Sequence, residues 1–190
     1  MRNLIVGLTL LILACSSVKQ EDDKSKVEKT IKDFLVWYST NWDSISVRST
    51  NRIIENWAQE TYDSTKFYRI NFTATETYLG IFSKSGFVSE VYLNEWREYF
   101  IVCQNEFEIN PQNMGPPSGF EYEFVFRGQM YDGFKNNPDK AFVAECKITD
   151  NKAIATVDWK GANDPRKYNL SKIGNDWKID RIRAYWEESK

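Results

Sequence analysis

Histidine is absent from the 190 residues of this chain, and cysteine occurs only three times. Without histidine the chain cannot use a Ser-His-Asp or Cys-His catalytic group, a histidine general base or histidine-ligated zinc. Glycine is also sparse, with nine residues, and they form neither a P-loop nor a dinucleotide-binding fingerprint. We therefore expect no metal site and no cofactor.

An excess of basic residues is missing as well. Lys and Arg number 25, Asp and Glu number 27, and the net charge is −2. A mildly acidic chain without a basic stripe is a poor candidate for nucleic-acid binding, so we expect no such partner. The chain is instead rich in apolar material, with 42% hydrophobic and 15% aromatic residues. These residues can build a core, and the aromatic ones can also line a pocket.

The N-terminal apolar run, residues 4–13, is too short to span a bilayer and is typical of a secretory signal. It ends in L-I-L-A-C, which resembles the lipobox of bacterial lipoproteins. The resemblance implies that residues 1–14 are a signal peptide, and that the acylated Cys15 anchors the chain in the bacterial cell envelope. Ser16 favours the outer membrane, and residues 15–24 are expected to form a polar tether. The alternative is a plain signal peptide with a chance cysteine.

One domain is predicted over residues 25–188, and its first half is helical. Ser25 and Glu28 have the spacing of a capping box, and the apolar residues after them recur at helical spacing up to Trp42. Further helices are predicted over 53–62, over 67–83 and, after the cap residue Ser89, over 90–107.

The second half has the pattern of an antiparallel sheet. Two hairpins are predicted, with turns at 150–151 and 174–175 and with strands over 142–149, 153–159, 167–173 and 177–183. Helices followed by a strand meander indicate an α+β domain, with helices packed on one face of a curved sheet.

The sequence Y-N-L-S-K-I-G-N-D-W-K-I-D-R-I, residues 168–182, resembles the closing hairpin of nuclear-transport-factor-2-like domains. D-F-L-V-W-Y at 33–38, S-G-F-V-S-E at 85–90 and the aromatic helix to Cys103 resemble an uncharacterised family of bacterial envelope proteins of that type. The resemblance implies a cone-shaped fold with a pocket between helices and sheet, which serves enzymes and binding modules alike. Relatives often carry an acidic residue near the aromatic stretch 124–132, and here Asp132 is the only one within it.

The remaining cysteines, Cys103 and Cys146, both lie on apolar faces of their predicted elements. Cys146 is expected to share its strand face with Phe142, Ala144 and Ile148. Two readings stay open, a disulfide that joins helix to sheet or two buried free thiols.

Among the carboxylates, Glu145, Asp158 and Asp180 alternate with apolar residues in strands. They are therefore expected on the solvated face of the sheet. We expect no cluster of two or more titratable groups between the helices and the sheet. Aromatic groups should line or fill that space, and the candidate pocket residues are Phe34, Tyr38, Trp159 and Trp177. Trp37 and Trp186 are the candidates for exposed aromatic side chains.

These patterns favour a non-catalytic envelope lipoprotein whose domain binds a small ligand, a glycan or another envelope protein. One alternative is an enzyme of the same fold that uses Asp158 or Asp132 as acid or base. Another is a periplasmic immunity or inhibitor protein. The lining of the pocket separates them, because convergent polar groups favour an enzyme, whereas a filled interior with an exposed aromatic patch favours a protein partner.

Overall fold

The structure, a computed structural model, describes residues 2–45, 52–57, 63–121, 123–126, 135–161 and 165–184, with side chains from residue 21 onward. It is an α+β arrangement in which helices precede a four-stranded antiparallel sheet. The helices are α1 (Arg2–Thr40), α2 (Trp42–Ile45), α4 (Phe72–Ser85), α5 (Glu90–Ile109) and the 3-10 turn η1 (Pro138–Lys140). The strands are β1 (Ile54–Glu55), β2 (Arg69–Ile70), β3 (Ala141–Thr149), β4 (Lys152–Trp159), β5 (Arg166–Ile173) and β6 (Asp176–Ala184).

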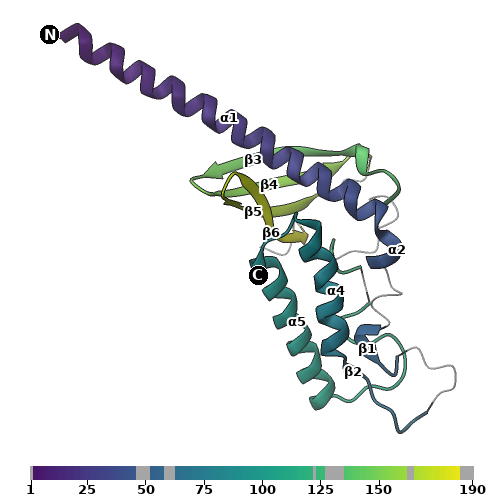
Figure 1. Ribbon diagram of the computed structural model, residues 1–190. Coiled ribbons are helices and arrows are strands. Elements are labelled where there is room, and N and C mark those ends of the chain that lie inside the picture. Colours follow the sequence, from purple (N-terminus) through teal and green to yellow (C-terminus); the bar gives the residue numbers. More distant parts are fainter. Residues whose placement is uncertain are drawn as a thin grey trace.

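Figure 1 shows α1 lying across the sheet, with α4 and α5 running side by side away from it. Helix α1 contacts both outer strands, β3 and β6. Within the part of the chain that the structure describes, no helix is both long and apolar enough to cross a membrane.

The two predicted hairpins are confirmed, and the strands pair in the order β3-β4-β5-β6. Their turns rest on backbone in the left-handed region, with φ of 52° at Asp150 and 63° at Gly174. Aspartate and glycine adopt this region more readily than most residues, which explains why the turn residues identified the hairpins.

Two β-bulges change which side chains face inward. One lies between Val143 and Glu145 in β3, so Cys146 packs on the same side as Val143, while Phe142 is 39% exposed. The expectation that Phe142 and Cys146 share a face is therefore wrong, because an extra residue shifts the side-chain alternation by one. The other bulge places Asp180 opposite the Asn169–Leu170 step of β5.

Helix α1 differs from the prediction at its start. It continues through Ser25 toward the N-terminus, so Ser25 is not a helix cap. Residues 16–24 contain neither proline nor glycine and include good helix formers, which lets the helix propagate across them. Asp23, within the expected tether, is buried against the sheet. From Val27 onward the predicted apolar face of the helix is buried, as expected.

The segment between α2 and α4 also differs from the prediction. Ile54 pairs with Ile70 in a short β1–β2 ribbon, where helices had been predicted over 53–62 and 67–83. Residues 58–62 lie outside the described part. Helix α4 begins only after Asn71, whose side chain accepts a hydrogen bond from the Ala74 amide at 3.0 Å. An asparagine cap of this kind fixes the start of a helix.

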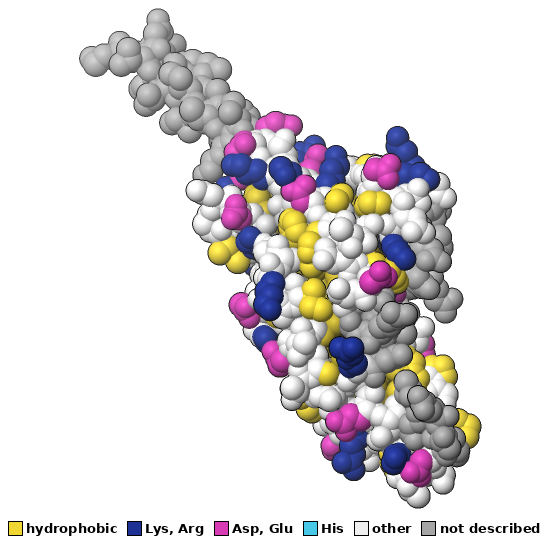
Figure 2. Space-filling view, turned by 45° about the vertical axis from the view of Figure 1, so that its right-hand side comes forward, with side chains coloured by type: hydrophobic (Ala, Val, Ile, Leu, Met, Phe, Trp, Pro, Cys, Tyr) yellow, Lys and Arg dark blue, Asp and Glu magenta, His cyan; other side chains and the backbone are white. Residues whose placement is uncertain are grey.

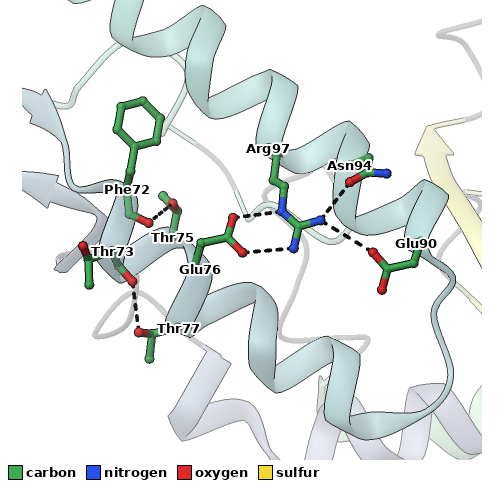
Figure 3. Close-up of polar contacts among 8 residues, drawn as sticks. All are labelled: Phe72, Thr73, Thr75, Glu76, Thr77, Glu90, Asn94 and Arg97. Atoms are coloured by element: carbon green, nitrogen blue, oxygen red, sulfur yellow. Dashed lines mark hydrogen bonds and ion pairs between the residues drawn. The ribbon is translucent and has the colours of Figure 1, made fainter.

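Helix α5 is confirmed, with Ser89 as its N-cap. It is joined to α4 by an ion pair in which Arg97 meets both carboxylate oxygens of Glu76, at 2.8 and 2.9 Å (Figure 3). Just before α5, the Ser89 amide donates to Ile179 of β6 and the Ile179 amide donates to Phe87. The helical hairpin is thus attached to the outer strand β6 by a parallel bridge at Val88.

Candidate functional site

The four candidate pocket residues are all buried in the core. The rings of Tyr38 and Trp159 both pack against Phe126, at centroid distances of 5.1 and 6.1 Å. Phe34 lies beside Tyr38 at 6.1 Å. The structure thus brings three of the four together in the interior. Trp177 lies apart from them, with its indole nitrogen donating to Asp23 at 3.4 Å.

Beside this interior lies a half-buried carboxylate that the sequence analysis did not single out, Glu123. It accepts a hydrogen bond from the Tyr38 hydroxyl at the end of α1. It also accepts from the amides of Val125 and Phe126, at 2.9 and 2.7 Å, and so closes the turn that follows it. Glu123 directly precedes the aromatic stretch 124–132.

Burial raises the pKa of Glu123, against the opposing effects of its hydrogen bonds and of the Arg166 charge. Burial also raises the pKa of Tyr38 well above 10, and the negative charge of Glu123 adds to this. The Arg166 side chain is fully buried and donates from Nε to the Phe126 carbonyl at 2.7 Å. The interior therefore contains an electrostatically coupled group rather than isolated polar atoms.

Three more tyrosines, Tyr78, Tyr92 and Tyr168, are buried around this group. Burial raises the pKa of Tyr78 and Tyr168 well above 10, and the charge of Glu123 acts on both. Within the described part of the chain, the Tyr168 hydroxyl has no hydrogen-bond partner. We call Tyr38, Tyr78, Tyr92, Glu123, Arg166 and Tyr168 the interior cluster.

The interior cluster corrects the expectation that no two titratable groups meet between helices and sheet. Strand alternation, on which that expectation rested, says nothing about Glu123 or about tyrosines on the inner faces of α1, α4 and α5. Sequence patterns treat such tyrosines as core residues, which they also are. Only their convergence on one carboxylate distinguishes them.

A groove of about 490 Å³ lies between α2 and α4. Four of its residues are one helical face of α4, at the spacing i, i+3, i+4 and i+7. The lining consists of Asp43, Ser44, Arg52, Ala74, Thr77, Tyr78 and Ile81. Tyr78 is buried at the floor of the groove and also belongs to the interior cluster, so the groove and the cluster meet at this side chain.

The strand carboxylates have mixed outcomes. Glu145 is exposed, as expected, and Asp158 is half-buried and accepts from the Trp159 amide. Asp180 is only 6% exposed, so its expected place in solvent is wrong. The bulge in β6 lets Asp180 accept hydrogen bonds from Ser89, at 2.6 Å, and from Ser171. Asp132 lies outside the described residues.

Ser171 and Lys152 stand side by side on β5 and β4, with Nζ donating to Oγ at 2.6 Å. A serine–lysine pair can act as nucleophile and base when the lysine is buried and neutral. Here the Lys152 side chain is 69% exposed and forms an ion pair with the Asp180 carboxylate at 3.3 Å, so it does not have the buried environment that such a base needs. The pair is therefore a surface network that fixes the bulge.

Cys103 and Cys146 are both free in the structure, which favours the free-thiol reading. Cys103 lies on α5 beside Gly119 and Tyr99, whereas Cys146 lies near Glu28 of α1. Burial raises the pKa of Cys103 to about 11, so its thiol is protonated at neutral pH and is a weak nucleophile. Among the described residues, no group of three or more carboxylate or thiol side chains could hold a metal ion.

Exposed aromatic side chains were expected at Trp37 and Trp186. Trp37 is instead half-buried, with Phe82 at 5.6 Å and Phe34 at 5.8 Å, and Trp186 lies outside the described residues. Figure 2 shows one face of the molecule, on which hydrophobic side chains lie among charged ones. At the end of the α4–α5 hairpin remote from the sheet, the first residue of α4, Phe72, and the last residue of α5, Ile109, are both exposed apolar side chains.

Comparison with known proteins adds no relative to this description: no family model matches the chain, and no similar curated protein or solved structure was found.

Proposed function

We propose that the chain is a lipid-anchored protein of the bacterial cell envelope, in the outer membrane, whose domain binds a small ligand without catalysis. Cys15 carries the lipid, and the domain is a cone of the nuclear-transport-factor-2-like type. The ligand occupies the groove between α2 and α4. The partners are therefore the membrane, through the anchor, and a small molecule.

The observation that carries this proposal is the position of Tyr78. Its side chain lines the groove, and burial raises the pKa of its hydroxyl, with the charges of Tyr92 and Glu123 adding to the shift. Ligand sites are commonly concave, with a few converging polar groups and perturbed pKa values beneath them. The groove volume lies within the range of roughly 300–1,000 Å³ that is usual for such sites.

The hydrogen bonds of Glu123 support binding over catalysis. Its carboxylate is held by Tyr38 and by two amides of its own turn. A group engaged in this way positions the wall of a site, whereas a general base must reach the proton that it removes.

An enzyme of the same fold is the second candidate, and the raised pKa of Glu123 favours it. The two candidates differ in what Glu123→Gln does to a ligand found for the groove. In a binding protein the ligand is released unchanged by the wild type. In an enzyme the wild type converts it and the variant does not, which mass spectrometry of the ligand detects.

The ligand site is tested by a thermal-shift screen of a small-molecule library, followed by Thr77→Trp, which fills the groove. A ligand that stabilises the wild type should lose its effect in this variant. Ser83→Trp, on the opposite side of α4 and exposed, is the matched control and should retain it. A ligand insensitive to both substitutions would place the site elsewhere.

The anchor is tested by Cys15→Ser and cell fractionation. The variant should lose membrane attachment, because no described helix can replace the lipid as an anchor. A processed variant that still pellets with membranes and resists a salt wash would overturn the lipoprotein assignment.

A further inference from the structure

We infer that the groove between α2 and α4 binds carbohydrate. This inference rests on the ligand-binding function proposed above and names the chemical class of the ligand. It follows from the combination of side chains that line the groove: a carboxylate and a guanidinium, hydroxyl groups, and a small apolar surface.

The charged residues of the lining are Asp43 on α2 and Arg52 just before β1. Both are exposed, and neither forms an ion pair with another described residue. A carboxylate only accepts hydrogen bonds and a guanidinium only donates them. A sugar hydroxyl does both, so neighbouring hydroxyls on one ring can satisfy both side chains without bringing a charge of their own.

The helix α4 side of the groove is amphipathic on a short scale. Ala74 and Ile81 present aliphatic groups one turn on either side of Thr77, which is exposed and presents a hydroxyl. A sugar ring has the same alternation, with an apolar face of C–H groups and an edge of hydroxyls.

Other ligand classes fit the lining less well. A fatty acyl chain would leave the polar groups of the groove covered and without partners, which costs free energy. An organic cation would be attracted by Asp43 but repelled by Arg52. An anion would be attracted by Arg52 but repelled by Asp43.

The experiment uses saturation-transfer NMR on the full mature protein with five probes. N-acetylglucosamine, galactose and maltose are the carbohydrate probes, laurate is the apolar probe and choline is the cationic probe. We expect transfer to at least one sugar. Asp43→Asn should weaken that sugar's binding by about tenfold or more, because a charge-assisted hydrogen bond is replaced by a neutral one. Asp139→Asn, an exposed change on η1 outside the groove, should leave it within about twofold.

Transfer to laurate or choline without any sugar would overturn the carbohydrate class and leave the ligand-binding function standing. Sugar binding that survives both Asp43→Asn and Thr77→Trp would overturn the site. Absence of transfer to all five probes would also overturn the inference, and the library screen described above then decides the ligand-binding function independently.

Discussion

Helix α1 is held to the rest of the domain by two carboxylate contacts, and the two work in opposite ways. Near the middle of the helix, Asp23 receives hydrogen bonds from Lys172 and from Trp177. At the C-terminal end, Tyr38 of the helix donates to Glu123. One contact joins a carboxylate to a cation and an indole N–H, and the other joins a carboxylate to a hydroxyl and two amides.

The pKa values of Asp23 and Glu123 are shifted in opposite directions. The hydrogen bond from Lys172 lowers the pKa of Asp23, whereas burial raises the pKa of Glu123. Asp23 therefore stabilises the fold above its unfolded pKa, near 3.8, and loses this effect as the pH falls through the lower folded value. Glu123 favours the fold most below its unfolded pKa, near 4.5, and that contribution is lost as the pH rises through the higher folded value. A cationic partner lowers the pKa of its carboxylate and stabilises the fold at neutral pH, whereas the contact with the Tyr38 hydroxyl does not offset the effect of burial on the pKa of Glu123.

The largest effect is expected from Tyr38→Ala, which breaks the interior contact. It removes a buried ring that packs on Phe126 and leaves Glu123 without its hydroxyl donor. The free energy of unfolding should fall by about 3–5 kcal/mol, as for other large aromatic truncations. Urea unfolding measures it, with Val36→Ala on the exposed side of the same helix as control. A loss below about 1 kcal/mol would mean that the interior cluster is not packed as described.

A smaller effect is expected from Asp23→Ala, which breaks the outer contact. Removing the carboxylate leaves the partly buried Lys172 ammonium and the Trp177 N–H without this acceptor. We expect a loss of about 1–3 kcal/mol at pH 7.

Asp22→Ala is the matched control for that change. Asp22 pairs with Lys26 on the exposed side of the helix, and such pairs contribute about 0–1 kcal/mol. Equal losses for Asp22→Ala and Asp23→Ala in urea unfolding would show that residue 23 belongs to a free tether, as the sequence suggested.

The contacts of α1 also show how much of the fold could be predicted from the sequence. Apolar spacing predicted the buried face from Val27 to Tyr38, because side-chain burial on a helix follows its period. The sheet was predictable for the same reason, with left-handed residues marking its turns. The contact of Asp23 was not, because its partner lies 149 positions further along the chain.

The candidate site was predictable in part. Its aromatic walls, Phe34, Tyr38 and Trp159, follow from local periodicity. Glu123 does not, because a lone glutamate after a loop is usually solvated, and its burial depends on Tyr38 at a separation of 85 residues. The groove was missed because its other wall, with Asp43 and Arg52, comes from segments distant in the sequence, and no local pattern places them opposite the α4 face.

The smallest effect is expected from Glu123→Gln, and it concerns how the free energy of unfolding changes with pH. Because burial raises the pKa of Glu123, ionising it in the folded state costs free energy, and the free energy of unfolding should decline as the pH rises above about 4.5. Glu123→Gln removes this titration while keeping the shape of the side chain, so the decline between pH 5 and pH 8 should be shallower in the variant. The effect is modest, since the bonds from Tyr38 and two amides oppose the burial. Urea unfolding at several pH values measures the slopes, and Glu98→Gln, an exposed change on α5, should leave the slope of the wild type unaltered. A variant slope as steep as that of the wild type would mean that burial does not raise the pKa of Glu123, and that this carboxylate does not differ from Asp23 in the way described.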